Sequence, residues 1–168
     1  SLIDEKTKMK MGINYSKNYP VLALLDIYLV SQAPLNVLKS SGSDTLVHIL
    51  ESFVSKESTP HTKSFSTHAF DLLIKNMPKI LNGQGTLKNW GNMQWASIFA
   101  MFALSNTSSG PVGAISYFLG TQYKIPHGIA GALLISKVTK YNHKNYFYDY
   151  AYLSDKKFDK KDIKKISE

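Results

Sequence analysis

The sequence predicts a mainly α-helical domain preceded by two short β-strands. Apolar residues alternate with polar ones in residues 8–15 and form a short continuous run in residues 21–26. After residue 43 the apolar residues recur with the 3.6-residue spacing of helices. The chain has 168 residues, which is enough for one domain that buries most of the surface of its unfolded chain.

Both predicted strands lie near the N-terminus. Residues 8–15 alternate polar and apolar side chains, which is typical of a strand with one covered face. Residues 21–26 follow Pro20 as a run of apolar side chains, which is typical of a buried strand. We therefore expect one strand in each of these segments.

The first long helix is expected to begin near Asp44. Residues 41–44 read Ser-Gly-Ser-Asp, and such side chains often cap the N-terminus of a helix. Asp44 therefore has two interpretations, as a capping residue or as a residue that binds a ligand. The inward face of this helix is formed by Leu46, Val47, Leu50, Phe53 and Val54.

Further helices are expected in the rest of the chain. One begins at Thr59-Pro60, because proline fits the first helical turn, and Pro78 breaks or ends it. Others are expected over residues 89–105, 110–120 and 128–141. Trp90 and Trp95 are expected to pack in the core. The tyrosine-rich residues 141–152 are predicted to form a packed C-terminal helix rather than a surface that stacks nucleic-acid bases.

The positive charge of the chain comes from lysine alone. The formal net charge is +8, and the 20 basic residues include no arginine. Arginine is the residue that clamps phosphates and reads guanine edges, so we expect no nucleic-acid partner. Many lysines lie in residues 156–165 among aspartates, which is typical of a solvated helix or a disordered end; the alternative is a basic patch for an acidic partner or a nucleic acid.

Composition also limits the chemistry and the location of the chain. The absence of cysteine excludes disulfides, zinc–thiolate sites and thiol catalysis, and it fits a reducing compartment. No apolar run is long enough for a membrane span. Residues 1–17 carry alternating charges without an apolar block, so we expect no signal peptide and a cytoplasmic location.

Three residues form a candidate metal site. Asp44 and His48 would lie on one face of a helix, one turn apart. His127 lies in a Pro-His-Gly sequence, where a turn meets a new helical pattern. Together, two histidines and one carboxylate would suit a divalent metal. The alternatives are a solvated aspartate beside structural histidines. His61 and His68 are assigned no metal or catalytic role.

Two longer segments resemble the signatures of the iron-containing alcohol dehydrogenases. The segment from Gly110 to Ala130, which includes His127, resembles the second signature. The resemblance implies a dehydroquinate synthase-like helical domain in which Asp44, His48 and His127 bind a divalent metal, iron or zinc. The first signature resembles Leu24-Leu25-Asp26, Pro34, Ser41 to Leu46 and Glu51.

The chain also departs from this family, at Lys39, where the first signature prefers an aliphatic residue, and at two positions near the candidate site. Gly113 stands where the family has a fourth metal ligand, a histidine, so we expect weaker metal binding than at a four-ligand site. Tyr117 stands where the family has a second histidine near the catalytic centre. Tyr117 is a candidate catalytic residue that would hydrogen-bond a substrate hydroxyl or a bound water; the alternative is a packed tyrosine.

The resemblance implies the interconversion of a small alcohol and an aldehyde with NAD(P). The sequence has no glycine-rich phosphate-binding loop, so NAD(P) would bind only if a separate nucleotide domain were supplied. The chain looks like the middle third of such an enzyme. We expect residues 1–43 to be a remnant of cofactor-domain strands and linker, residues 44–152 to be the helical metal-site domain and residues 153–168 to be a lysine-rich tail.

Two functional hypotheses follow. The first is the metal-site helical domain of such an oxidoreductase, inactive by itself. The second is a non-catalytic remnant or interaction module that has lost cofactor and metal binding. In either case we expect a homo-oligomer or pairing with a polypeptide that carries the nucleotide domain, because the N-terminal strands would otherwise have an unpaired edge.

Overall fold

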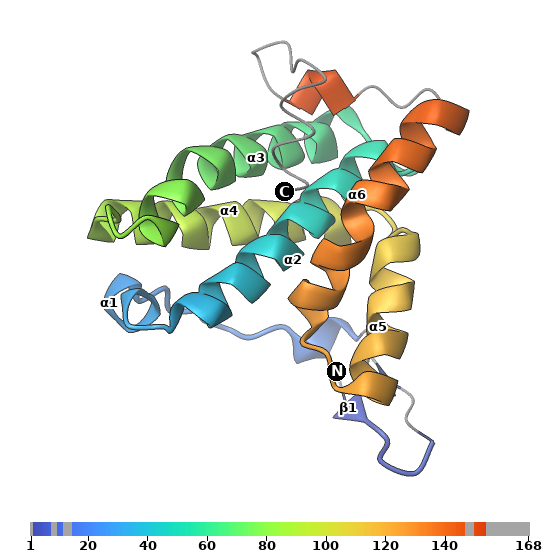
Figure 1. Cartoon of the computed structure of the whole chain (residues 1–168), viewed down its shortest axis with the longest axis horizontal. Coiled ribbons are helices and arrows are strands. Elements are labelled where there is room, and N and C mark those ends of the chain that lie inside the picture. The colour runs from blue at the N-terminus through green and yellow to red at the C-terminus, as the bar shows by residue number, and fades with distance from the viewer. Residues whose placement is uncertain (1, 8–9, 12–14, 147–149, 154–168) are drawn as a thin grey trace.

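Helix α2 (Leu35–Val54) runs through the middle of the molecule, with the other long helices packed around it (Figure 1). The computed structural model describes residues 2–7, 10–11, 15–146 and 150–153. The remaining elements are β1 (Leu2–Ile3), β2 (Lys10–Met11), η1 (Ser16–Asn18), α1 (Ile27–Ser31), α3 (Pro60–Leu81), α4 (Leu87–Ser105), α5 (Pro111–Tyr123), α6 (His127–Tyr146) and η2 (Tyr150–Leu153).

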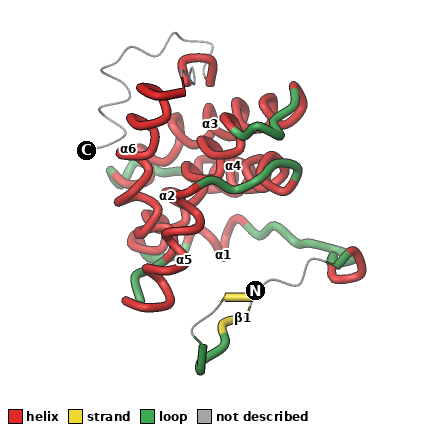
Figure 2. The backbone as a smooth tube through the Cα atoms, turned by 90° about the vertical axis from the view of Figure 1, so that its right-hand side faces the viewer, coloured by secondary structure: helices red, strands yellow, loops and turns green. Residues whose placement is uncertain are grey.

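The predicted fold class is confirmed, with a correction to the strands. β1 and β2 pair in antiparallel fashion, with Leu2 opposite Met11, and this hairpin lies below the helices in both views (Figures 1 and 2). The prediction of a strand over residues 21–26 is wrong, because this segment is a loop that leads into α1. Leu24 is 84% exposed. An apolar run forms a buried strand only where other strands pair with it and cover it.

The prediction that a helix begins near Asp44 is also wrong, because α2 already begins at Leu35. The carbonyl of Pro34 accepts hydrogen bonds from the N–H groups of the first helical turn. The hydroxyls of Ser41 and Thr45 donate to main-chain carbonyls one turn earlier, at 2.9 Å in each case. These side chains are therefore accommodated within a helix, and Asp44 lies in its middle rather than at a capping position.

Helices α3 and α4 pack extensively against each other and against α2. α3 begins after Thr59, as predicted, but Pro78 does not break it. Pro78 lies in the last part of the helix, so its missing N–H removes one hydrogen bond close to the helix end. The core lies where α2 meets these helices and includes Val47, Ile49 and Phe53 of α2, Phe70 and Leu73 of α3, and Trp90, Ala96 and Ala100 of α4.

The second tryptophan of α4 lies outside this core. Trp90 is buried as expected, but Trp95 is 47% exposed and stacks on Phe99. The prediction that Trp95 packs in the core is therefore wrong. Both faces of α4 carry apolar side chains, so the sequence pattern does not distinguish its inner face from its outer one.

Two glycines bring α6 close to α2. A Cβ atom at Gly128 would collide with the carbonyl oxygen of Ser40, and one at Gly131 would lie 2.9 Å from Cγ2 of Val47. α5 packs mainly on α6. Helices α2, α5 and α6 therefore form a junction that carries Asp44, His48, Gly113, Tyr117 and His127.

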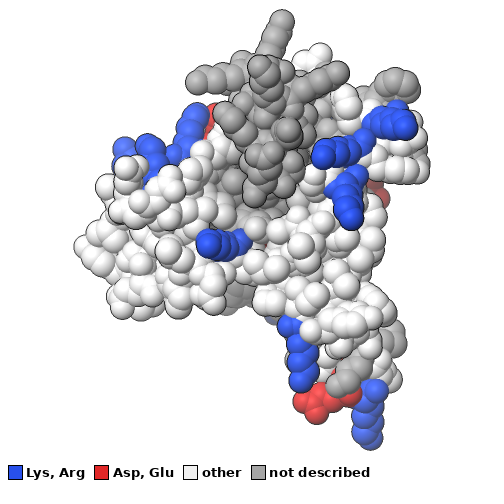
Figure 3. Space-filling model, in the orientation of Figure 1, with Lys and Arg blue, Asp and Glu red and all other residues white. Residues whose placement is uncertain are grey.

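The C-terminal prediction is corrected in part. α6 extends to Tyr146, residues 147–149 lie outside the described residues, and Tyr150–Leu153 form η2, with Tyr150 and Leu153 buried. The lysine-rich residues 154–168 lie outside the described residues. On the face shown in Figure 3, lysines are scattered and most of the surface between them is uncharged. Within the described ranges, no helix has both the length and the apolar character needed to cross a membrane.

Candidate metal centre

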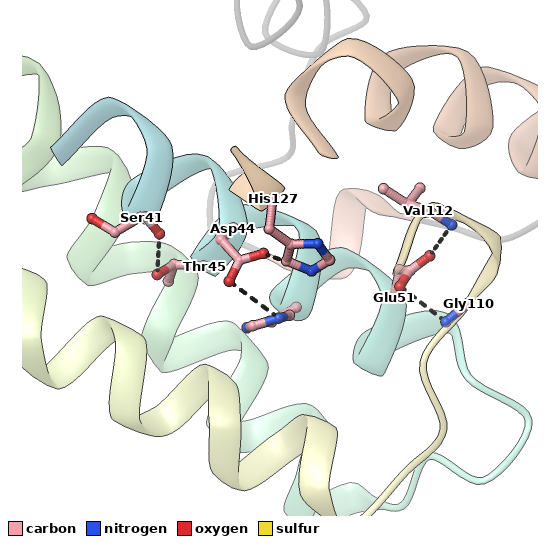
Figure 4. Close-up of polar contacts among 8 residues, drawn as sticks. Ser41, Asp44, Thr45, Glu51, Gly110, Val112 and His127 are labelled. Atoms are coloured by element: carbon pink, nitrogen blue, oxygen red, sulfur yellow. Dashed lines mark hydrogen bonds and ion pairs between the residues drawn. The ribbon is translucent and has the colours of Figure 1, made fainter. Parts of the chain in front are cut away.

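The carboxylate of Asp44 faces two imidazoles at the junction of α2 and α6. Its Oδ2 lies 3.5 Å from Nε2 of His48, and its Oδ1 lies 3.6 Å from Nε2 of His127 (Figure 4). Asp44 and His48 are one turn apart on α2, and His127 is the first residue of α6. The structure thus brings together the three residues that the sequence suggested, although they come from two helices.

Burial sets the charge state of His48. Removal of its ring from water lowers the pKa of His48 from its usual value. The carboxylate of Asp44 raises this pKa and so opposes the effect of burial, and His127 lowers the pKa by a smaller amount. Desolvation is the largest of these causes. His48 therefore favours the neutral imidazole, which is the form whose nitrogen lone pair can bind a metal.

The types of donor fit a divalent transition metal. One carboxylate and two imidazoles are the ligands of many such sites. Metal–ligand bonds of about 2.0–2.2 Å at tetrahedral angles place neighbouring donor atoms about 3.4 Å apart, so the 3.5 and 3.6 Å separations suit ligands of one ion as well as ion pairs. Among the residues that the structure describes, no three histidine, aspartate or glutamate side chains are already arranged to hold a metal ion.

Gly113 of α5 has space for a Cβ atom. A Cβ atom at Gly113 would lie 3.5 Å from Oε2 of Glu51 and 3.5 Å from Cβ of Ser109. These are ordinary van der Waals contacts, so the backbone at Gly113 has room for a side chain. The absence of a donor at this position is therefore a property of the residue rather than of the space.

Tyr117 contacts the candidate site directly. Its ring stacks on the ring of His127, with centroids 4.7 Å apart and an angle of 14° between the planes. Tyr117 is 42% exposed, so it is not a core residue. The stacking covers one face of the imidazole and restricts the orientation of the ring.

Glu51 is the residue to which sequence reasoning gave no role. It is 6% exposed, and its two oxygens accept hydrogen bonds from the N–H groups of Gly110, at 2.9 Å, and Val112, at 2.8 Å (Figure 4). Burial raises the pKa of Glu51, and these backbone donors oppose the rise. Its spacing places it on the same helix face as Asp44 and His48, but its partners on α5 lie far away in the sequence.

The other two histidines considered in the sequence lie on the exposed surface of α3. The ring of His68 packs edge-on against Phe99 of α4, with centroids 4.8 Å apart. His61 is the second residue of the same helix, after Pro60. Neither of them is part of the ion pairs around Asp44.

Asp44, His48 and His127 all lie within the part of the chain that matches a known protein family. The profile described as the Fe-containing alcohol dehydrogenase family, C-terminal, matches residues 39–166. The chain is 33% identical over 141 residues to a 1,3-propanediol dehydrogenase of Citrobacter freundii, which covers 84% of this chain and 36% of that protein. It is 30% identical over 141 residues to an NAD-dependent methanol dehydrogenase of Bacillus methanolicus, covering 84% and 37%.

A solved structure has a similar fold. The crystal structure of sulfoacetaldehyde reductase from Bifidobacterium kashiwanohense in complex with NAD+ superposes with a TM-score of 0.78 and 28% sequence identity. This match covers 84% of this chain and 38% of that one. The chain therefore spans a little over a third of the length of the relatives that it matches.

Proposed function

Because the chain belongs to the Fe-containing alcohol dehydrogenase family, as the match over residues 39–166 establishes, we propose that it is the metal-site helical domain of an NAD(P)-linked oxidoreductase. The proposed reaction interconverts a small alcohol and an aldehyde. Relatives named as 1,3-propanediol and methanol dehydrogenases support this substrate class. The observation that carries the proposal is the carboxylate of Asp44, which is shared by imidazoles from α2 and α6.

Asp44, His48 and His127 are the proposed metal ligands. A divalent ion, iron or zinc, would polarise the oxygen of the alcohol or the carbonyl when bound there. Asp44 contributes negative charge, and burial keeps His48 in the neutral form that can bind. Gly113 contributes no donor, so we propose weaker binding than at a four-ligand site. The proposed domain is residues 44–152, with its first helix extended back to Leu35.

Tyr117 is the proposed substrate-side residue. Its ring holds the imidazole of His127 in orientation by stacking. Because the side chain is partly exposed, its phenol is able to donate a hydrogen bond to the oxygen of a substrate that approaches from solvent. Substitution of Tyr117 by phenylalanine would retain the stacking and remove this donor.

We propose that NAD(P) is held by a nucleotide-binding domain that these 168 residues do not include, either on a separate polypeptide or on a longer chain. The exposed apolar residues of segment 21–29 are the proposed contact for that domain or for a second copy of this chain. By itself the chain is expected neither to bind NAD(P) tightly nor to oxidise alcohols, because hydride transfer needs a nicotinamide held against the substrate. The cytoplasm stays the predicted compartment.

One alternative has support of its own. A non-catalytic remnant or interaction module would have the same fold without cofactor or metal binding. Glycine at position 113 favours this second function, as does the lack, among the described residues, of three histidine, aspartate or glutamate side chains already arranged to hold a metal ion. The two proposals differ in one measurable property, which is the affinity of the folded chain for a divalent metal.

Calorimetric titration of the purified chain with Zn²⁺ tests the proposal. We expect one equivalent to bind, with binding lost in Asp44→Asn and in His127→Ala. His68→Ala is the matched control, because it removes an exposed imidazole from α3 and should leave binding unchanged. Failure of the unsubstituted chain to bind Zn²⁺, Co²⁺ or Fe²⁺ would favour the non-catalytic alternative.

A further inference from the structure

A buried carboxylate joins α2, which carries Asp44 and His48, to the first turn of α5, which carries Tyr117. We infer that Glu51 is a positioning residue: it fastens the first turn of α5 to α2 and thereby holds Tyr117 against His127. The inference depends on the proposed function only in treating this junction as a metal site.

Glu51 supplies the N-terminal cap that α5 does not have within its own sequence. The N-cap residue of α5 is Gly110, which has no side chain to accept the first N–H groups of the helix. Glu51 accepts hydrogen bonds from the N–H groups of Gly110 and Val112. A carboxylate at this end of a helix is also favoured by the helix dipole.

This link matters because α5 has few other contacts with α2. α5 packs mainly against α6, and its packing against α2 is slight. Its first turn therefore depends on Glu51 for its position relative to α2, which carries Asp44 and His48. Tyr117 lies further along the same helix, so a shift of the first turn would move its ring relative to His127.

The hydrogen-bond partners of Glu51 indicate that it positions α5 and does not act as a metal ligand. Both oxygens of Glu51 accept N–H groups of α5, at 2.9 and 2.8 Å. The two imidazoles are instead paired with the carboxylate of Asp44. Glu51 therefore acts on the site through the backbone of α5 and not as one of its donors.

Gly110 gives a second, independent means of breaking the link. A Cβ atom at this position would lie 2.5 Å from Oε1 of Glu51. The φ angle of Gly110 is −91°, which any residue adopts, so glycine is needed here for space rather than for conformation. Gly110→Ala should therefore displace the carboxylate while leaving Glu51 itself intact.

The matched control is the neighbouring residue on α2. Ser52 is fully buried, and its hydroxyl lies 2.9 Å from that of Ser66 on α3. Ser52→Ala removes a buried hydrogen bond next to Glu51 but on the side away from α5. It should lower stability without altering the candidate site.

Two measurements on Glu51→Gln, Gly110→Ala and Ser52→Ala test the inference. The first is the NMR shift of the ring protons of His127, which the stacked ring of Tyr117 displaces. We expect Glu51→Gln and Gly110→Ala to move this shift towards its value in Tyr117→Leu. Ser52→Ala should leave the shift unchanged. The second is Zn²⁺ affinity, which should fall roughly tenfold or more in the first two variants only.

The outcomes separate this inference from the proposed function. If the unsubstituted chain binds no metal, the proposed function fails, whereas the NMR shift, measured without metal, still tests the role of Glu51. The inference is overturned if Glu51→Gln and Gly110→Ala leave the His127 shift as in the unsubstituted chain, or if Ser52→Ala changes it equally. It is also overturned if both Glu51-link variants unfold while Ser52→Ala folds, because Glu51 would then be required for the fold itself.

Discussion

The junction of α2, α5 and α6 and the segment 21–29 are both rich in apolar residues, yet their side chains have opposite environments. At the junction, Gly128 and Gly131 let two helices approach closely, and Val47 and Val112 are buried between them. In segment 21–29, residues such as Leu24 extend into solvent. The geometry of the candidate site is thus determined within the chain, whereas most apolar side chains of segment 21–29 are exposed, even though α1 packs against α4.

This contrast predicts where substitutions act. At the junction, changes should alter stability and the site together, because buried side chains have no room to adjust. In segment 21–29, changes should alter association and leave stability almost unchanged. The predictions below test the contrast, beginning with the largest expected effect.

Gly128→Ala should cause the largest loss of stability. Its Cβ would collide with the carbonyl oxygen of Ser40, so α6 would have to move away from α2. We expect the free energy of unfolding to fall by about 3 kcal/mol, as for overpacked cores, and the approach of His127 to Asp44 to be lost. Denaturant unfolding measures the first effect, and the NMR shift of His127 reports the second.

Gly113→Ala is the matched control for this prediction. The same methyl group at this position meets only ordinary contacts, and the helix gains up to about 1 kcal/mol when alanine replaces glycine in its interior. Equal destabilisation by the two substitutions would contradict the close approach of α6 to α2 as the cause.

The sequence predicted the local part of the site better than its tertiary part. The pairing of Asp44 with His48 follows from helical periodicity, so it does not depend on where α2 begins. The start of α2 was misplaced because Ser41 and Thr45 suit a cap as well as a helix in which they bond back to carbonyls. The position of His127 depends on the space at Gly128, which a sequence does not display, so its proximity to Asp44 did not follow from local spacing.

Two further errors have the same physical origin. Residues 21–26 have the composition of a buried strand, but burial requires a partner surface that apolar composition does not specify. Glu51 received no role because its hydrogen-bond partners, Gly110 and Val112, lie far away in the sequence. Contacts of this kind follow from the fold and not from local spacing.

Gly113→His should raise the affinity of the chain for a divalent metal by about tenfold or more, because a fourth donor would be added to the proposed site. The space beside Glu51 and Ser109 accepts a Cβ atom without a clash. Calorimetric titration with Zn²⁺ measures the effect, and Gly113→Ala is the control without a donor. Unchanged affinity in Gly113→His would argue that the metal does not bind at this junction.

Glu51 should give the stability of the chain a distinctive pH dependence. Burial raises its native pKa above the ordinary value of 4.5, and backbone donors from α5 and the charge of His127 oppose the rise in part. The native state therefore binds this proton more tightly than the unfolded state, and ionisation of Glu51 costs stability as the pH rises from 4.5 through the native pKa.

Comparison with Glu51→Gln isolates this contribution. The free energy of unfolding of the unsubstituted chain, minus that of Glu51→Gln, should fall with rising pH across this window and then level off. Denaturant unfolding between about pH 4.5 and pH 8 measures the difference. Ser52→Ala should give a difference that does not vary with pH, and an increase with pH for Glu51 would mean that its hydrogen bonds outweigh its burial.

The smallest effect on stability is expected in segment 21–29. Leu24→Asp should change the free energy of unfolding by no more than about 0.5 kcal/mol, because this side chain is already in solvent. It should nevertheless shift the chain from dimers or larger species towards the monomer, since a charge disfavours burial of the segment against another protein surface. Lys88→Gln makes the same change in net charge at an exposed site on α4 and should leave association unchanged. Gel filtration at modest salt measures the oligomeric state of each variant. If the unsubstituted chain elutes as a monomer at every concentration, then segment 21–29 does not associate with a second copy of the chain.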